Sequence, residues 1–431
     1  MGPVSGDEKY LLVLGAAMSL RERAIVAALR VFDGPLVTIA RGRDSRAAKF
    51  FDHVLVGDFS DPDDSLRAVV EHEKETGRVP AGVVPFFDPG LVPGWAIADH
   101  YGLPFLSRAA VDDSSINKNR MKDKLLAAGV ATPRYTQVDS VEAALAAAGG
   151  YGFPCVIKPS AFGGSLGVRL VSDAAEVERA YSYARRIIDE NAAVFTVKNR
   201  EIQVEEFCPL VDEVSVEVLN HGTEQVVLAV TDKILGPRPY FAEIGHRVPS
   251  RYSSRSDVDD VTKRACAAIG LDRGIAHVEL RLEPGAAPVV MEVGARTAGD
   301  GILDQVERVC GVSPYELHVL SYLDRLDRMP ELPAPSGLAG ISVLKAAPGR
   351  VSAVRKPSSV DPAVRGYEVS AVAGTRSGAT QANYLDREGY VEFVWPGAVP
   401  EDVPLDTQTV IARDLSAQLF EVDDADLPAA P

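Results

Sequence analysis

The sequence predicts a multidomain protein that begins with a parallel α/β domain and continues as α+β structure. Three observations lead to this prediction. Near the amino terminus, short apolar runs alternate with helical stretches, which is the pattern of βα units in parallel sheets. In the middle of the chain, several strand patterns follow one another with short turns between them. A proline-rich segment at 329–337 then precedes a last region rich in valine, glycine and threonine.

Length and composition indicate a globular protein of several domains. A chain of 431 residues is longer than a domain with a single hydrophobic core usually is. Its 46% hydrophobic and 25% charged residues are typical of globular proteins. The apolar run at 11–20 is too short to cross a bilayer, so we expect neither a signal peptide nor a membrane anchor, and a cytoplasmic location. The net charge of -16 repels polyanions, so we expect small-molecule partners and no nucleic acid.

The first domain is expected to be Rossmann-like and to cover residues 1–110. Its strand patterns are KYLLVLGAA at 9–17, PLVTIA at 35–40 and HVLVGD at 53–58, with helical stretches between them. The turn after the first strand lacks the glycines of a dinucleotide fingerprint, which argues against a nicotinamide cofactor.

An α+β region is expected to follow over residues 111–205 and to continue over 206–330. A helix from about Ile116 should open it, because Gly129 and Pro133 stop the helical pattern. Strand patterns then follow, and the last two should form a hairpin through the turn His221-Gly222. The four patterns are PCVIK, REIQVEEFC, EVSVEVLN and QVVLAVTD. Residues 331–431 are expected to form a β-rich carboxyl-terminal domain and tail. The four cysteines show no Cys-x-x-Cys spacing, so neither a zinc site nor a disulfide frame is expected.

The stretch KPSAFGGSLGV at 158–168 has the composition of a phosphate-binding loop. Glycines let backbone N–H groups approach an anion, and Lys158 supplies a positive charge. The lysine precedes the glycines, so the stretch is not a Walker loop, and the glycine spacing is not the dinucleotide fingerprint.

Two alternating runs around the turn at 283–286 predict a second hairpin. On the first strand Val278, Leu280 and Leu282 should face the core, while His277, Glu279 and Arg281 share the other face with Glu292, Gly294 and Arg296 of the return strand. Glu279 and Glu292 then become cross-strand neighbours, a repulsive pair unless a cation such as Mg²⁺ lies between them. The alternative is two solvated glutamates, but Arg296 and the phosphate loop favour the metal.

Together these motifs resemble the ATP-grasp superfamily, and within it the L-amino-acid ligases that make dipeptides, of the bacilysin-synthetase type. The resemblance covers about residues 8–420 and is most specific over 117–300. It implies an ATP-grasp fold, with 111–205 as the small lid subdomain and 206–330 as the large subdomain that carries the metal site. A homodimer is also a family-level expectation.

The resemblance implies a role for each matching residue. Lys118 and Lys158 match the two ATP-binding lysines, and residues 160–167, which we call the lid loop, match the loop that closes over the phosphates. In that loop Ser160, Gly163, Gly164 and Ser165 are the expected nucleotide contacts. Glu206, Phe207 and Cys208 match the adenine hinge and Glu213 the residue facing the ribose. Glu279 and Glu292 match the carboxylates for one or two Mg²⁺ ions, for which Mn²⁺ can substitute, and Arg296 matches the anion-binding arginine.

The substrate residues implied by the resemblance lie near the metal carboxylates. Glu243 is expected to bind the ammonium group of a substrate and His246 its carboxylate or acyl phosphate. Many members have asparagine where this chain has Gly294, so one metal ligand is missing and we expect the space to admit the acceptor. Asp300 is expected near the same pocket, where an acidic group could select an amino or guanidino group.

The implied activity is ATP-dependent formation of an amide bond between two amino-acid-like substrates through an acyl phosphate, with release of ADP and phosphate. Lys158, Arg296 and His246 are the expected catalytic residues. Three alternatives stay open at this point: another ATP-grasp chemistry such as a carboxylase or a formate-using ligase, a silent nucleotide-binding regulatory module, and a dinucleotide-dependent oxidoreductase. The intact pair of carboxylates argues against the second, and the missing glycine fingerprint argues against the third.

Overall fold

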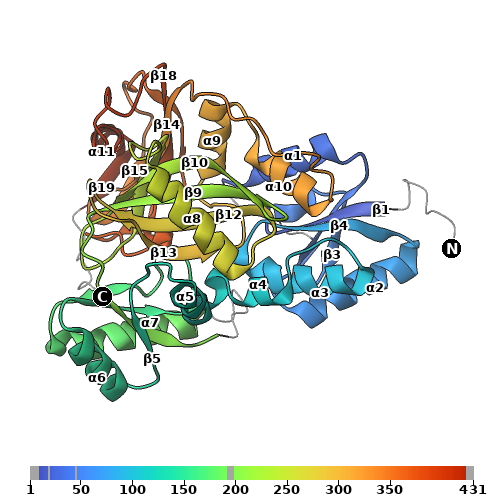
Figure 1. The fold of residues 1–431 in the computed structure, drawn as a ribbon. Helices are drawn as coiled ribbons and strands as arrows, with labels where there is room; N and C mark the ends of the chain where they lie inside the picture. The colour runs from blue at the N-terminus through green and yellow to red at the C-terminus, as the bar shows by residue number, and fades with distance from the viewer. Residues whose placement is uncertain (1–8, 18–19, 44–45, 192–198, 424–431) are drawn as a thin grey trace.

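The computed structural model describes residues 9–17, 20–43, 46–191 and 199–423. These residues form four sheets with helices packed on their faces (Figure 1). Among the described helices, none is long and apolar enough to span a bilayer.

The predicted parallel sheet forms at the amino-terminal end, in the order β3-β2-β1-β4. Its strands are β1 (Lys9–Leu14), β2 (Leu36–Ala40), β3 (His53–Val56) and β4 (Val79–Pro85). Helix α1 (Glu22–Val31) lies on one face together with α10 (Pro314–Tyr322), and α2 (Pro62–Thr76) and α3 (Leu91–Tyr101) lie on the other (Figure 1). Helix α2 begins where it does because the Asp61 carboxylate accepts hydrogen bonds from the backbone N–H groups of Asp63 and Asp64. A short helix, α4 (Arg108–Asp112), leads out of this region.

A separate antiparallel sheet carries the lysine that precedes the lid loop. Its order is β5-β8-β6-β7, with β5 (Tyr135–Val138), β6 (Cys155–Pro159), β7 (Arg169–Val171) and β8 (Ile202–Glu206). Helices α6 (Val141–Tyr151) and α7 (Val177–Asn191) cover one face and bury a core of their own. Lys158 lies on β6, and the lid loop connects β6 to β7.

The largest sheet has eight strands in the order β13-β12-β9-β10-β11-β14-β18-β16. These strands are β9 (Asp212–His221), β10 (Glu224–Leu235), β11 (Glu243–Val248), β12 (Arg273–Leu282), β13 (Val289–Gly294), β14 (Gly337–Leu344), β16 (Val364–Val369) and β18 (Gly389–Pro396). Both predicted hairpins, β9–β10 and β12–β13, are confirmed. Strands from either side of the proline-rich segment therefore share one sheet.

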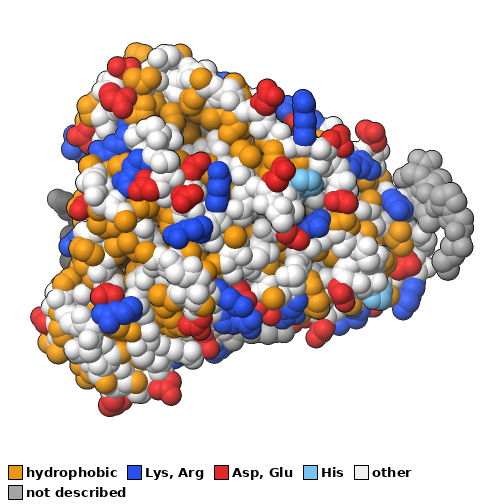
Figure 2. Space-filling model, in the orientation of Figure 1, with side chains coloured by type: hydrophobic (Ala, Val, Ile, Leu, Met, Phe, Trp, Pro, Cys, Tyr) orange, Lys and Arg blue, Asp and Glu red, His pale blue; other side chains and the backbone are white. Residues whose placement is uncertain are grey.

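In the β12–β13 hairpin, one face is apolar and the other carries the polar residues of the cavity. Val278, Leu280 and Leu282 pack with α5 (Lys118–Ala127) and α8 (Ser256–Ile269), so the predicted sorting of faces in this hairpin is confirmed. The remaining elements cover the carboxyl-terminal part: α9 (Ile302–Cys310), α11 (Thr407–Leu419), and a small sheet of β15 (Gly349–Val354), β17 (Arg376–Ser377) and β19 (Phe420–Asp423). On the face shown in Figure 2, cationic and anionic side chains are interspersed.

Candidate active site

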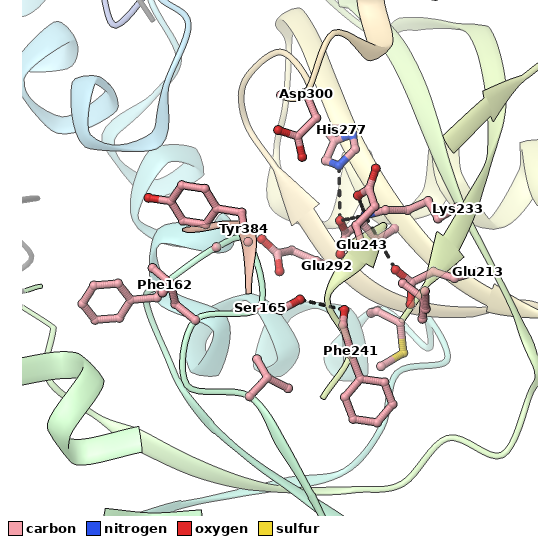
Figure 3. A pocket seen from close by; sticks show the side chains of 18 of the residues that line it. Phe162, Ser165, Glu213, Lys233, Phe241, Glu243, His277, Glu292, Asp300 and Tyr384 are labelled. Carbon is pink, nitrogen blue, oxygen red and sulfur yellow. Dashed lines mark hydrogen bonds and ion pairs between the residues drawn. The ribbon is translucent and has the colours of Figure 1, made fainter. Parts of the chain in front are cut away.

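A cavity of about 610 Å³ opens on the polar face of the large sheet. The parallel sheet, the lid loop, the large sheet and the carboxyl-terminal segment all contribute to its wall, and Figure 3 shows part of it. Most of the predicted site residues line it: Lys118, Lys158, Gly163, Gly164, Ser165, Glu206, Phe207, Cys208, Glu213, Glu243, Glu279, Glu292, Arg296 and Asp300. Motifs that are up to about 180 residues apart in the chain therefore meet around one space.

The two predicted metal carboxylates lie opposite each other. Glu279 on β12 pairs with Glu292 on β13 in the antiparallel register. A lysine accompanies each of them: Glu279 Oε1 lies 2.5 Å from Lys233 Nζ, and Glu292 Oε2 lies 3.2 Å from Lys118 Nζ. Burial raises the pKa of Glu279, but Lys233 and His277 lower it well below the ordinary value, so the carboxylate is charged. The site thus holds opposed anions whose repulsion is offset by cations.

Lys233 on β10 lies at the centre of a cluster of three glutamates (Figure 3). Its Nζ is 2.5 Å from Glu279, 3.0 Å from Glu243 and 3.6 Å from Glu213. Its side chain is only 6% exposed, and although burial lowers its pKa, the three carboxylates raise it well above the ordinary value. Glu213 also forms an ion pair with Arg281, whose Nε lies 2.8 Å from Glu213 Oε2. Burial raises the pKa of Glu213.

The two predicted ATP lysines face different partners. Lys118, at the start of α5, donates to the carbonyl of Phe162 in the lid loop at 3.0 Å. Lys158 lies 2.6 Å from Glu205, a buried carboxylate that also pairs with Lys122 at 3.5 Å. Burial lowers the pKa of Lys122 to about 8. Both ATP lysines are thus held by carboxylates or carbonyls at the cavity wall.

The lid loop is docked at both of its neighbours. The Ser165 hydroxyl donates to the carbonyl of Phe241 at 2.7 Å (Figure 3), and the backbone N–H of Tyr384 donates to Gly164 O at 3.2 Å. Gly164 has a φ of +62°, and a Cβ there would collide with the ring of Tyr384. A glycine is therefore required at this position for the loop to lie against the carboxyl-terminal segment.

Glu206 of the predicted hinge and Arg296, the predicted anion-binding arginine, also have partners. Glu206 forms two hydrogen bonds of 3.0 Å with Arg134 at the mouth of the cavity. Arg296 donates from Nε to Asp88 at 2.7 Å and from Nη1 to the carbonyl of Thr297 at 2.9 Å. Burial lowers the pKa of Arg296, but Asp88 raises it, so this guanidinium keeps its charge in the wall of the cavity.

Three predicted site residues do not line the cavity. His246 is 1% exposed and lies behind Glu243, to which its Nδ1 is hydrogen-bonded at 3.0 Å. Gly294 is packed in the sheet, where a Cβ would lie 3.4 Å from the carbonyl oxygen of His277. Ser160 is fully buried, and its Oγ accepts a weak hydrogen bond from Asn199 at 3.4 Å. The expected contacts of Ser160 and His246 with ligands, and the expected space for the acceptor at Gly294, are therefore not found at the surface of this cavity.

Asp300 lines the cavity but is already paired. Both of its carboxylate oxygens accept hydrogen bonds of 2.7 Å from Arg387. Burial raises the pKa of Asp300, but Arg387 lowers it below the ordinary value. Asp300 would have to give up this bidentate pair to bind a cationic substrate group, so the expected selection of such a group lacks a free carboxylate here.

Several cavity residues were not found by sequence reasoning. Asp88 follows β4, Arg21 precedes α1, and Arg387 follows a short turn before β18, so none lies in a recognisable motif. For Lys233 the sequence does contain an indication of a site, because a lysine there interrupts an apolar strand pattern. In the structure it pairs with Glu213 on the neighbouring strand. A bulge between Val227 and Ala229 shifts that register by one residue, and this shift is not readable from the sequence.

The residues at Glu279 and Glu292 fit Mg²⁺. They offer hard oxygen ligands from adjacent strands, and in the described part of the chain Glu279 Oε1 and Glu292 Oε2 are held by lysines and His277. Within the described residues, no three His, Cys, Asp or Glu side chains form a metal-binding group. This donor set is the kind that holds Mg²⁺ through one or two carboxylates while nucleotide phosphates and water complete the shell.

Comparison with known families decides the fold. An ATP-grasp domain model matches residues 151–304, which include both lysine-loop and carboxylate motifs. Residues 151–304 of this chain therefore form an ATP-grasp domain. The crystal structure of an L-amino acid ligase from Bacillus licheniformis superimposes with a TM-score of 0.79 over 98% of this chain and 100% of that one, at 20% identity. The ATP-grasp fold expected from the sequence is thereby confirmed.

Two curated proteins are similar in sequence to this ATP-grasp chain. An alanine–anticapsin ligase of Bacillus subtilis is 26% identical over 243 residues, which are 52% of this chain. The chain spans only half the length of that relative, 50%. A formate-dependent phosphoribosylglycinamide formyltransferase of Burkholderia vietnamiensis is 26% identical over 355 residues, covering 79% of this chain and 81% of that protein.

Proposed function

We propose that this ATP-grasp protein is an ATP-dependent ligase that joins the carboxylate of one amino acid to the amine of another. The observation that carries the proposal is the placement of Glu279 opposite Glu292 in the wall of a cavity that Lys158, Arg296 and Glu243 also line. His246 lies outside this lining and forms a pair with Glu243 through a hydrogen bond. The first four residues suit phosphoryl transfer to an anion, and the last pair suits a substrate ammonium group. The similarity to the alanine–anticapsin ligase supports the same reading.

The reaction has two balanced steps. A substrate carboxylate oxygen attacks the γ-phosphorus of ATP, the bond to the bridging oxygen breaks, and ADP leaves. The nitrogen of the second substrate then attacks the acyl carbon, the carbon–oxygen bond to phosphate breaks, and the nitrogen releases a proton to phosphate or water. The products are an amide, ADP and phosphate.

The residues of the chain would act mainly through position and charge. Bound Mg²⁺, held by Glu279 and Glu292, would supply charge neutralisation between the phosphates. Lys118, Lys158 and Arg296 would orient the phosphates and the attacking carboxylate, which are anions that repel each other in water. Glu243 would hold the donor ammonium, with His246 fixing its orientation from behind.

The lid loop would keep water away from the acyl phosphate. Its contacts with Phe241 and Tyr384 close it over the cavity wall. An acyl phosphate that meets water is hydrolysed, so closure would protect this intermediate in addition to holding the nucleotide.

One rival chemistry has a specific observation behind it. The match to the formate-dependent formyltransferase covers more of this chain than the match to the alanine–anticapsin ligase. In that case formate, and not an amino acid, would be the carboxylate that is phosphorylated.

The test is ADP and phosphate release with Mg²⁺-ATP and the proteinogenic amino acids, singly and in pairs, with formate and bicarbonate as competing acids. We expect one or more pairs to give a product whose mass equals the sum of the two amino acids less water. ADP release that requires formate or bicarbonate would contradict the proposal. ATP binding without any turnover would instead support a regulatory nucleotide-binding module.

A further inference from the structure

Arg21 is a buried cation in the cavity wall that forms no ion pair with a carboxylate among the described residues, although Asp88 and Asp300 act on it at longer range. Its side chain belongs to the segment just before α1, and the residue is 7% exposed. Nη1 donates to the carbonyl oxygen of Phe86 at 2.6 Å, and the guanidinium carbon lies 4.9 Å from the centre of the Phe87 ring. Both contacts are with uncharged groups, so neither neutralises the guanidinium.

The other two arginines at this end of the cavity are each neutralised. Arg296 lies 2.7 Å from Asp88, and Arg387 lies 2.7 Å from Asp300. An unpaired buried charge is costly, and proteins therefore keep one mainly where a ligand supplies the counter-charge. Burial together with the charge of Arg296 lowers the pKa of Arg21 to about 10, against the opposing effect of Asp88 and Asp300, so the group is still cationic at neutral pH.

The guanidinium of Arg21 is open toward the cavity on the side of Gly299. A Cβ at Gly299 would lie 3.2 Å from Nη2, so the glycine leaves this nitrogen free of a neighbouring side chain. Arg21, Asp88, Gly299 and Asp300 all line the same cavity as the lysines and Glu292. A ligand anion could thus reach Arg21 while the rest of the ligand points toward Arg296.

The geometry points to Arg21 as the binding residue for the carboxylate of the amine substrate, which makes that substrate an amino acid and not a simple amine. The inference rests on the proposed function. Two amino acids bring two carboxylates, and the one that reacts must approach the γ-phosphate beside Lys118, Glu292 and Arg296. The other carboxylate keeps its charge from substrate to product, and a permanently charged arginine suits such a group.

The ion pairs of the two other arginines in the same wall strengthen this assignment. Arg387 is engaged through both of its terminal nitrogens by Asp300, and Arg296 through Nε by Asp88. Among the described residues, the hydrogen-bond partner of the Arg21 side chain is a backbone carbonyl, that of Phe86. Among these three guanidinium groups, it is therefore the one that forms no ion pair with a carboxylate of the described residues, which suits it to bind a second substrate carboxylate.

The test compares acceptors with and without a carboxylate in the full-length enzyme. For a productive pair, amide formation is measured with the acceptor amino acid, with its primary amide, and with hydroxylamine, which traps acyl phosphates as hydroxamates. Arg21→Met, Arg21→Lys and the exposed control Arg30→Met are assayed alongside wild type. Arg30 lies on α1 and its side chain is 57% exposed in an ion pair with Glu316.

We expect wild type and Arg30→Met to prefer the free amino acid over its amide by about 10- to 100-fold in kcat/KM. A preference of this size is what one hydrogen-bonded pair between charged groups contributes to binding. Arg21→Met should lose that preference through a higher KM for the amino acid, and Arg21→Lys should recover part of it. Hydroxamate formation, which needs no acceptor carboxylate, should fall much less than peptide formation.

The outcomes separate the two proposals. If Arg21→Met, folded as judged by circular dichroism, keeps the preference, or loses hydroxamate and peptide equally, the assignment of Arg21 is wrong. The same holds if wild type accepts amides as readily as amino acids. If wild type forms neither hydroxamate nor peptide with any amino acid, the proposed ligase function itself is wrong.

Discussion

Replacing Lys233 by methionine should destabilise the nucleotide-free protein strongly. The substitution keeps most of the side-chain volume but removes the cation that lies 2.5 Å from Glu279, 3.0 Å from Glu243 and 3.6 Å from Glu213. Three carboxylates would then face one another in a wall where the lysine side chain is 6% exposed. Removing one partner of a buried ion pair costs about 3–5 kcal/mol, and we expect the loss to fall in that range.

The assay is urea unfolding of Lys233→Met with and without millimolar Mg²⁺. A divalent cation bound at Glu279 can replace part of the lost charge, so Mg²⁺ should recover stability in the variant more than in wild type. Lys263→Met is the matched control, because its pair with Asp259 is 3.4 Å long and its side chain is 38% exposed. Such a surface pair contributes about 1 kcal/mol or less. A loss for Lys233→Met as small as the control's, or one that Mg²⁺ leaves unchanged, would refute the reasoning.

Three further predictions concern turnover, lid closure and pH. Arg296→Ala should lower kcat by about 100-fold or more while calorimetry finds ATP affinity nearly unchanged, because the charge acts on the developing transition state; loss of ATP binding with intact turnover would show that this role is wrong. Gly164→Ala, which forces a Cβ against the Tyr384 ring, should open the lid loop and raise the phosphate released per amide formed; a ratio still equal to one would count against closure. Burial lowers the pKa of His277, but Glu217 and Glu279 raise it to about 9, above the 6.5 of the unfolded state. The resulting stability is present below pH 6.5 and is lost as the pH rises through 9, by about 1.4 kcal/mol per pH unit at most. Urea midpoints should follow this fall in wild type, and an equally steep fall in His277→Gln would exclude His277 as its origin.

The elements of the fold that depend on local patterns were predictable. The parallel strands of the first domain and the faces of the β12–β13 hairpin follow from apolar runs and strict alternation. Alternation within each strand put Glu279 and Glu292 on one face. A bulge between Glu279 and Leu280 then sets them directly opposite, which counting from the turn would have missed.

Contacts between distant segments were not predictable from one sequence. Asp88 reaches Arg296 across 208 positions, and Arg387 reaches Asp300 across 87. Each of these residues lies in a segment without repeat or motif, and only the packing of separate sheets brings them to the cavity. Burial also separates His246 from the cavity lining, because its ring is 1% exposed and is hydrogen-bonded to Glu243.

The most direct test of carboxylate activation at this site is the transfer of oxygen from the substrate to phosphate. A productive amino-acid pair is incubated with Mg²⁺-ATP after the donor carboxylate has been labelled with ¹⁸O, and the released phosphate is weighed by mass spectrometry. The proposed acyl phosphate predicts one ¹⁸O atom in each phosphate formed together with an amide. Phosphate without label, formed at the same rate as the amide, would show that the carboxylate oxygen never bonded to the γ-phosphorus and would contradict the proposed mechanism.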